Sequence, residues 1–456
     1  MWYFGAGAGL NFNSITNGIP AFLTGNAMGL TEGSAIYCNS AGELLFYTNG
    51  HSVWNKNHFA MPNGGDLGIT GQILSSMQSA LIIPFCSDTN KYYVFSNSGV
   101  WSGGGEGLFY SIVNMTLDGG LGDVTPAGAV NLVGSTSECF TAVRHSNGSD
   151  HWVVVNLDSS NIYYAYQLTD AEVKPPVISV LGSVSGGTGH LKASPLGNKL
   201  AYSTSGVGVG PGITANAGTT LFDFDNSTGI LSNPNTINQT SGMAVSFSPD
   251  GKLLYLDDGP GIYQFDLSAS NISASKAMIG THSSMGGGGV GDIQIGPDSK
   301  LYISVPLVSF LDVVNFPNTL GTGCNLTNQS VLVTGSNSIG LPNNITSFMT
   351  PWEHNCIDTS VAPVVSDSIF FPNVFSPNGD GHNELFLIYN KGYKDLSCKI
   401  YNRWGTLMYE WVGTTGYWDG TANGMNADDG TYYYVLEANS EAGNTLKKNG
   451  FFQLIR

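Results

Sequence analysis

Charged residues are scarce in this chain, and basic residues are the scarcest. Of its 456 residues, 16 are Lys or Arg and 33 are Asp or Glu, which gives a formal net charge of −17 at pH 7. Nucleic acids and anionic membrane surfaces are bound through clusters of Lys and Arg. The composition therefore argues against nucleic acid and anionic membranes as partners.

Long apolar runs are also missing. No run reaches the ~18 residues that a membrane-spanning helix needs, and no long stretch shows a helical period. The opening residues Met1–Gly5 lack the basic and apolar segments of a signal peptide. If the protein is exported, we expect the chain to begin at or near a processed terminus.

Cysteine is sparse, with six in the chain and no Cys-x-x-Cys pair. Zinc and redox motifs of that type are therefore not indicated, while free thiols and disulfides both stay open. Cys398 alternates with Leu396 and Ile400, so we expect it to be a buried small apolar residue.

Glycine and small polar residues, by contrast, are abundant. The 61 glycines, together with many Asn, Ser and Thr, are typical of extracellular β-proteins with many turns. A unit of turn, strand, hairpin and strand recurs about every 45 to 60 residues, the period of propeller blades. Its six copies begin at Gly42, Asn90, His151, Asn198, Gly251 and Ser299.

The clearest copies are Ser246–Tyr255 and Ile293–Tyr302, and they resemble blades of WD40-like and lactonase-like propellers. A seventh blade can be assembled if Trp2–Gly5 lies beside Asn344–Phe348, which would close the ring and leave no exposed edge. We therefore predict a seven-bladed β-propeller over residues 1–350.

The last part of the chain reads as a small β-domain. Alternation through Leu396–Ile400 and Tyr432–Leu436 is the period-2 pattern of strands with one buried face. Asn-Gly and Asp-Gly dipeptides mark tight turns about every ten residues. An immunoglobulin-like β-sandwich is expected over residues 369–456, which makes the whole chain all-β.

Four blocks follow one another in this region: Phe371–Gly381, Ile400–Gly405, Tyr417–Gly420 with Asp429–Val435, and the terminal Leu454–Arg456. In this order they resemble the gliding-motility-associated, type B C-terminal sorting domain of the Bacteroidetes type IX secretion system. The positions that carry the resemblance are Pro372, Asn373, Pro377, Asn378, Gly379, Asp380, Gly381, Asn402, Arg403, Trp404, Gly405, Trp418, Asp419, Gly420, Gly430, Tyr432 and Arg456.

The resemblance implies export to the cell surface. It implies as partners the type IX translocon with its outer-membrane shuttle barrel, and a second outer-membrane barrel that anchors type B substrates. The N-terminal run also resembles the propeller that often precedes this sorting domain in surface proteins. Given export, we expect Cys324 and Cys356 to form a disulfide, which would add roughly 3–4 kcal/mol in the chain-entropy model.

Two departures from the family pattern are mild: His382-Asn383-Glu384 follows the first turn, and Lys448-Asn449-Gly450 opens the last strand. The oxygens of Asn378, Asp380 and Asn383 would suit Ca²⁺ as a cofactor. A polar hairpin turn explains these residues equally well. Residues 351–368 read as an extended linker, in which Asp367–Ile369 resembles the O-glycosylation site of this phylum, with Ser368 as acceptor.

Ionisable or polar residues fall at or just before the innermost strand of five predicted blades: Glu32, Gln78, Glu138, His190 and Asp292. They are expected to converge at one mouth of the channel, where they could hold a cation or a small polar ligand. A solvated channel lining explains them without any ligand. Among like charges held this close, one carboxyl pKa should rise unless a cation compensates.

Catalytic signatures are absent, since the sequence has no Gly-x-Ser-x-Gly, no His-Glu-x-x-His and no phosphate loop after a strand. We therefore expect a non-enzymatic surface protein that binds a glycan or protein, or builds a surface assembly. The alternative is a carbohydrate-active hydrolase or lyase, for which Trp54 and Trp101 could stack on sugars.

Overall fold

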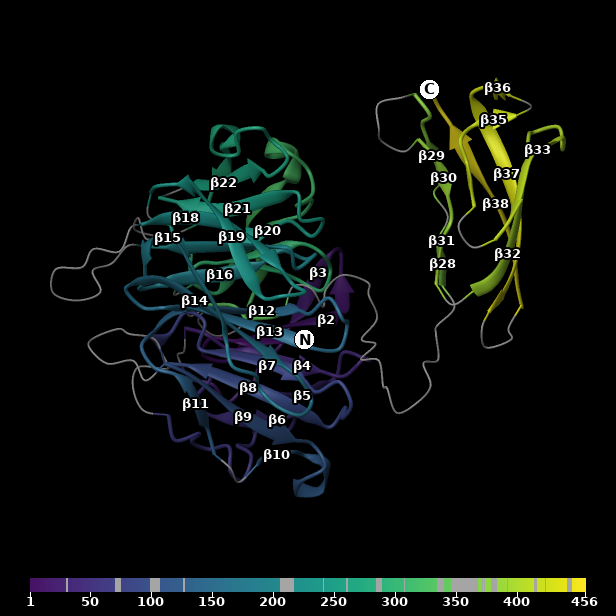
Figure 1. Cartoon of the computed structure of the whole chain (residues 1–456). Helices are drawn as coiled ribbons and strands as arrows, with labels where there is room; N and C mark the ends of the chain where they lie inside the picture. The colour runs from purple at the N-terminus through teal and green to yellow at the C-terminus, as the bar shows by residue number, and fades with distance from the viewer. Residues whose placement is uncertain are drawn as a thin grey trace. The chain divides into compact units, whose positions relative to one another are not determined.

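The computed structural model describes residues 1–29, 32–69, 75–98, 107–125, 128–205, 217–240, 242–259, 261–283, 289–306, 308–333, 340–345, 368–370, 372, 374–378, 384–391, 393–413, 416–422, 424–440 and 445–456. The chain divides into two compact units, Met1–Ile357 and Asp358–Arg456. Each unit is described by itself below (Figure 1).

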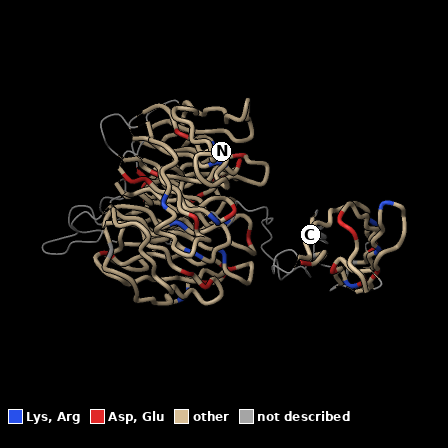
Figure 2. Tube along the Cα trace, turned by 90° about the horizontal axis from the view of Figure 1, so that it is seen from above, with Lys and Arg blue, Asp and Glu red and all other residues tan. Residues whose placement is uncertain are grey.

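Strands make up nearly all the regular structure of both units. The described residues contain no α-helix and three short 3₁₀ turns, η2 (Asp118–Gly120), η3 (Ser273–Ser275) and η4 (Gly321–Cys324). The prediction of an all-β protein is confirmed. Charges lie thinly scattered along the described trace, with no stretch where Lys and Arg gather (Figure 2).

In its described part the N-terminal unit holds seven small antiparallel sheets, each built from strands that follow one another in the chain. The first three are β1 (Trp2–Phe4), β2 (Ala8–Thr16), β3 (Ile19–Phe22); β4 (Ala35–Cys38), β5 (Leu44–Thr48), β6 (Val53–Asn55); and β7 (Ala80–Pro84), β8 (Lys91–Asn97), β9 (Leu108–Asn114), β10 (Asp123–Val124), β11 (Val130–Val133).

Four sheets of four strands complete this unit. They are β12 (Thr136–Arg144), β13 (His151–Leu157), β14 (Ser160–Leu168), β15 (Val177–Ser185); β16 (Gly189–Ala193), β17 (Lys199–Thr204), β18 (Gly218–Asp225), β19 (Ile230–Asn238); β20 (Val245–Phe247), β21 (Leu253–Asp258), β22 (Gly261–Asp266), β23 (Ala277–Thr281); and β24 (Ile293–Ile295), β25 (Leu301–Ser304), β26 (Phe310–Val314), β27 (Leu326–Leu332). Each of the six segments predicted from the recurrent unit forms the second strand of a sheet, namely β5, β8, β13, β17, β21 and β25.

The first sheet packs against both its successor and the last sheet. One apolar cluster contains Trp2 and Phe4 of β1, Tyr47 of β5, and Tyr302 and Leu311 of the last sheet. The ring of Trp2 lies 5.4 Å from that of Tyr302, edge to face. The two ends of this series of sheets therefore meet around the strand nearest the N-terminus.

The predicted pairing at this junction is tested only in part. Trp2–Phe4 pairs along one edge with Ala8–Leu10 inside its own sheet, and Asn344 and Ile345 form no strand, so the proposed strand beside Trp2–Gly5 stays a prediction. The C-terminal segment instead lies beside residue 34, because Pro342 forms a parallel bridge with Ser34 and the Asn343 N–H donates to the Ser34 carbonyl at 2.7 Å. Residues 346–348 lie outside the described part.

The C-terminal unit is built on one five-stranded sheet of order β29-β38-β37-β32-β33, in which only the β29–β38 pair is parallel. Three two-stranded sheets accompany it: β28 with β31, β30 with β34, and β35 with β36. The bounds are β28 (Ser368–Phe370), β29 (Val374–Phe375), β30 (Phe386–Leu387), β31 (Tyr389–Lys391), β32 (Tyr393–Tyr401), β33 (Leu407–Val412), β34 (Tyr417–Trp418), β35 (Thr421–Ala422), β36 (Met425–Asn426), β37 (Gly430–Ser440) and β38 (Thr445–Leu454).

Alternation in the sequence correctly predicts which face of this sheet is buried. Leu396, Cys398 and Ile400 of β32 are all buried, as are Tyr432, Tyr434 and Leu436 of β37. Trp418 packs against them, and its ring centroid lies 5.0 Å from that of Tyr432. Cys398 is a free thiol in this core, which confirms its role as a small apolar residue.

The disulfide prediction is wrong for Cys324. Cys324 is a free, fully buried thiol at the end of η4, where it packs with Tyr255 and Leu301. Cys356 lies outside the described residues. Among the described cysteines, the one that is disulfide-bonded is Cys86, two residues after the end of β7. Spacing in the sequence could not identify it, because disulfides depend on the distance and direction of side chains after folding.

The predicted linker, residues 351–368, lies outside the described part except for its last residue. Ser368 opens β28 and pairs with Lys391 of β31. This residue therefore belongs to a sheet of the C-terminal unit, and its O-glycosylation stays a prediction.

Candidate functional site

The five candidate channel residues lie in, or just before, the first strands of five different sheets of the N-terminal unit. Glu138 lies in β12 and His190 in β16, the first strands of their sheets, whereas Glu32, Gln78 and Asp292 lie just before β4, β7 and β24. Glu32 is half-buried, and the other four are no more than 1% exposed.

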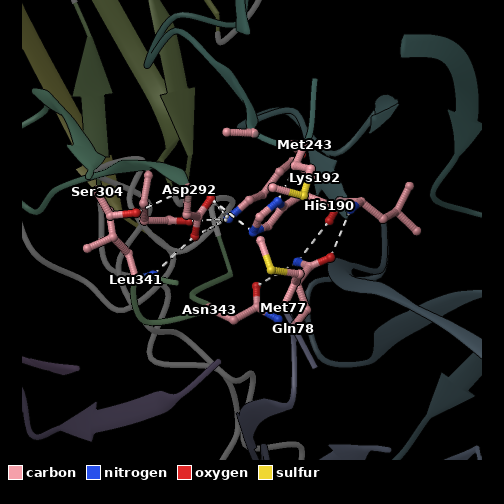
Figure 3. Close-up of polar contacts among 12 residues, drawn as sticks. Met77, Gln78, His190, Lys192, Met243, Asp292, Ser304, Leu341 and Asn343 are labelled. Atoms are coloured by element: carbon pink, nitrogen blue, oxygen red, sulfur yellow. Dashed lines mark hydrogen bonds and ion pairs between the residues drawn. The ribbon is translucent and has the colours of Figure 1, made fainter. Parts of the chain in front are cut away.

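The side-chain amide of Gln78 makes all of its hydrogen bonds to groups of neighbouring sheets and of the 340–345 segment. Its Oε1 accepts hydrogen bonds from the N–H groups of Leu191 at 2.8 Å and Phe140 at 3.2 Å. Its Nε2 donates to the Leu191 carbonyl and to Asn343 Oδ1, both at 3.2 Å (Figure 3). Both ends of the amide are satisfied by protein, so Gln78 connects β12, β16 and the 340–345 segment and has no free group for a ligand.

A buried ion pair lies at the centre of the cluster. Lys192 Nζ is 3.1 Å from Asp292 Oδ1 and also donates to Gln294 Oε1 at 2.7 Å. Lys192 is 3% exposed and Asp292 1% exposed. Asp292 is held further by the N–H of Leu341, which donates to Oδ2 at 3.4 Å (Figure 3).

His190 faces the same carboxylate. Its Nε2 lies 3.3 Å from Asp292 Oδ1, and its Nδ1 lies 3.0 Å from the Met243 carbonyl (Figure 3). The Nδ1 contact is a hydrogen bond when Nδ1 carries the proton, whereas Nε2 is buried and has no hydrogen-bond partner among the described residues. Burial lowers the pKa of His190, with Asp292 opposing that shift and Lys192 adding to it.

Glu32 and Glu138 form the acidic end of the cluster. Glu138 Oε2 accepts a hydrogen bond from the Met77 N–H at 3.1 Å, and Glu32 Oε1 accepts one from Ser75 Oγ at 3.2 Å. The pKa of Glu138 is raised to about 8, chiefly by burial, with the nearby charges of Glu32 and Asp158 adding to this shift and the Met77 hydrogen bond opposing it. Burial also raises the pKa of Glu32 to about 7. These carboxyls therefore hold protons near neutral pH.

The sequence interpretation missed Lys192, the cation that balances Asp292. A signal was present, because side chains two positions apart on a strand point to the same side. Lys192 follows His190 by two residues in β16, and Gln294 follows Asp292 by two at β24.

Metal ligands do not gather in the described part of the chain. Within it, no group of three or more His, Cys, Asp or Glu side chains is placed to hold a metal ion. Of the proposed Ca²⁺ ligands, Asn378 is exposed, while Asp380 and Asn383 lie outside the described residues. The Ca²⁺ site therefore stays a prediction.

In the C-terminal unit, several of the motif residues have clear structural roles. Asn402 Oδ1 accepts hydrogen bonds from the N–H groups of Trp404 and Thr406, which closes the turn before β33. Gly405 completes this turn with φ +80°. Trp418 is fully buried, and its Nε1 donates to the Thr421 carbonyl at 2.7 Å.

The terminal residue Arg456 ties two of the motif turns together. Its Nη2 donates to the Gly420 carbonyl at 2.9 Å, and its Nη1 donates to the Ala427 carbonyl and lies 3.5 Å from Asp429 Oδ1. Gly420 has φ +81°, and a Cβ there would lie 2.9 Å from Pro377. Of the remaining motif positions, Asn373, Gly379, Asp380 and Gly381 lie outside the described residues.

Comparison with known proteins identifies this unit. Residues 369–454 match the CHU_C type IX secretion signal domain. The secretion signal domain thus covers nearly all of the C-terminal unit and supports export by the type IX system. No curated protein matches the chain.

Solved structures similar to the chain are distant. A provisional 6-phosphogluconolactonase from Bacteroides uniformis is 15% identical with a TM-score of 0.43, over 73% of this chain and 96% of that one. A second, from Bacteroides fragilis, is 13% identical with a TM-score of 0.42, over 74% and 95%. A protein of unknown function from Desulfotomaculum acetoxidans is 12% identical with a TM-score of 0.37, over 88% and 94%. Likeness at this level says nothing about activity.

A helix long and apolar enough to cross a membrane does not occur in the described residues.

Replacing Asp292 by Asn should strongly destabilise the N-terminal unit, because it leaves the Lys192 ammonium buried without a counter-charge. The expected loss is about 3–5 kcal/mol of unfolding free energy, measured by urea unfolding of the full chain. Asp223→Asn is the matched control: its pair with Lys199 at 2.7 Å is partly exposed, so the loss should stay below about 1 kcal/mol. Equal losses would contradict the role of the buried pair.

Stability of the N-terminal unit should fall as pH rises from about 4.5 to about 8. In that range the folded state keeps protons on Glu138 and Glu32 that the unfolded chain releases near pH 4.5. Glu138→Gln should flatten this dependence and stabilise the unit at pH 8 by at least about 1 kcal/mol, since an amide oxygen can still accept from Met77. Urea midpoints of both proteins at pH 5 and pH 8 test this. If Glu138→Gln loses as much stability between these two pH values as the unchanged protein does, the prediction is refuted.

Proposed function

We propose that this protein is a type IX secretion substrate that is displayed at the outer surface of the cell. The observation that carries this proposal is the match of residues 369–454 to the secretion signal domain. Its partners would then be the translocon and its outer-membrane shuttle barrel. The order of the motif blocks favours the type B class, and with it retention through an outer-membrane barrel and a part in adhesion or gliding.

We also propose a more detailed fold for each of the two units. We take the N-terminal unit to be a seven-bladed β-propeller, supported by seven sheets in chain order and by the packing of the first sheet against the last. We take the C-terminal unit to be an immunoglobulin-like sandwich. In support, Phe386 of a two-stranded sheet stacks on Phe452 of the five-stranded sheet, with ring centroids 3.8 Å apart.

For the N-terminal unit we propose a non-enzymatic role in binding a surface glycan or protein, or as a building block of a surface assembly. The central polar groups support this role. Gln78 is bonded to Leu191, Phe140 and Asn343, while Lys192 pairs with Asp292, and all of these contacts are buried. The amide of Gln78 and the ammonium group of Lys192 therefore already have protein partners.

One observation favours a second candidate, a carbohydrate-active enzyme. Glu138 and Glu32 are neighbouring carboxyls with raised pKa values, and a carboxyl that keeps its proton is what a glycosidase uses as general acid. A glycan screen separates the two roles. Binding without turnover fits the first, and turnover abolished by Glu138→Gln fits the second.

Deleting residues 369–456 should trap the N-terminal unit in the periplasm, because the part recognised by the export machinery is gone. The measurement is the fraction of protein that external protease reaches on intact cells, compared with the full chain. Protease resistance of the trapped fragment after cell lysis controls for folding. A truncated protein that still reaches the surface would disprove the export role.

A further inference from the structure

Arg403 and Trp404 of the secretion signal domain lie exposed in a turn that other residues build. In the turn Asn402–Thr406, the side chain of Asn402 and the backbone of Gly405 account for the geometry. Trp404 is 75% exposed, although a large apolar side chain is normally buried. Arg403, also exposed, lies with its guanidinium carbon 4.9 Å from the centroid of the Trp404 ring.

The two arginines at this end of the domain differ. Arg456 is paired with Asp429 and with the carbonyls of Gly420 and Ala427. Arg403 makes no ion pair and donates no hydrogen bond to any described residue, and its guanidinium lies over the ring of Trp404. The planar guanidinium of Arg403 therefore presents free donors, which suit a carboxylate with two parallel hydrogen bonds.

These side chains border a hollow of about 260 Å³, which we call the Arg403 hollow. Its walls include Arg403, Trp404, Met408, Met425, Asp428 and Asp429. The volume lies below the range of about 300–1,000 Å³ that is usual for small-molecule sites. A hollow of this size is better suited to one or two side chains of a protein partner.

The chemistry of the wall also fits a protein partner. Met425 is 71% exposed, and methionine adapts its shape to an apolar surface. Trp and Arg are the residue types that most often dominate binding energy in protein interfaces. The side chain of Asp429 is already paired with Arg456, whereas Asp428 is exposed and offers an opposite charge at the rim.

We propose that the Arg403 hollow is the surface by which a protein of the type IX machinery recognises this domain. The partner would place a carboxylate against Arg403, a basic group against Asp428, and an apolar side chain between Trp404 and Met425. This proposal rests on the proposed export function and names the part of the domain that carries it.

The test is surface display of the full chain with Arg403→Ala or Trp404→Ala in the producing cell. Each variant should lower the protease-accessible fraction roughly tenfold or more, because loss of a charged or aromatic anchor weakens a protein interface strongly. Melting temperatures of the purified full chains should equal that of the unchanged protein, since both side chains are exposed. Arg403→Glu should abolish display by placing two carboxylates together.

Lys399→Ala is the matched control. Lys399 is exposed on β32 of the same sheet, lies 3.7 Å from Glu410, and is not part of the hollow. Its loss should leave display unchanged. If Lys399→Ala lowers the protease-accessible fraction as much as Arg403→Ala does, the assignment of recognition to the Arg403 hollow is overturned.

The outcomes separate this proposal from the one it rests on. If the Arg403 and Trp404 variants reach the surface normally while deletion of residues 369–456 traps the protein, the hollow is not the recognition surface and export by this domain stands. If the deletion itself leaves display intact, the export function falls. If Trp404→Ala lowers the melting temperature, that variant is set aside. Arg403→Ala, Arg403→Glu and Lys399→Ala then test the hollow without it.

Discussion

Burial of both faces of every sheet is the constraint on which the N-terminal unit depends. In β12, Phe140 and Ala142 pack toward the preceding sheet, whereas Cys139 and Val143 pack toward the following one. The same division occurs in β21, where Leu254 belongs to a different cluster from Leu253 and Tyr255. No sheet of this kind is stable alone, because each apolar face needs a neighbour. Packing of the first sheet against the last removes the two faces that an open series would leave exposed.

This constraint explains which parts of the structure the sequence could predict. Strands buried on both faces read as short continuous apolar runs between turns, so Leu253–Leu256 and its counterparts could be located, and the period-2 face of Leu396–Ile400 could be assigned. The central contacts could not, because Lys192 and Asp292 are 100 residues apart and their meeting depends on how the sheets that carry them are oriented. Strand periodicity places each side chain on a face but gives no distance between faces. The disulfide prediction failed for the same reason.

Seven residues of the secretion signal motif fall into two groups. The first group has roles in the fold, because its side chains or backbones close turns, fill the core or connect loops: Asn402, Gly405, Gly420, Trp418 and Arg456. Arg403 and Trp404 have none of these roles, yet they lie in the turn that Asn402 and Gly405 build. A scaffold that holds a free guanidinium and an exposed indole in fixed positions is pre-organised for binding, since less conformational freedom is lost when a partner arrives.

The scarcity of charge gives the few buried charges of the N-terminal unit their importance. Lys192 pairs with Asp292, and Gln78 joins Phe140 of β12 to Leu191 of β16, so these side chains hold neighbouring sheets together. Glu32 and Glu138 are the exception, because they are kept protonated by burial instead of being neutralised by a cation, and because Glu32 is only half-buried. Among the five candidate residues, Glu32 is therefore the one that solvent reaches. Ligand binding that involves the centre is best tested at Glu32 and Glu138, whereas binding that leaves both carboxyls untouched would use the outer surfaces of the sheets and the loops between them.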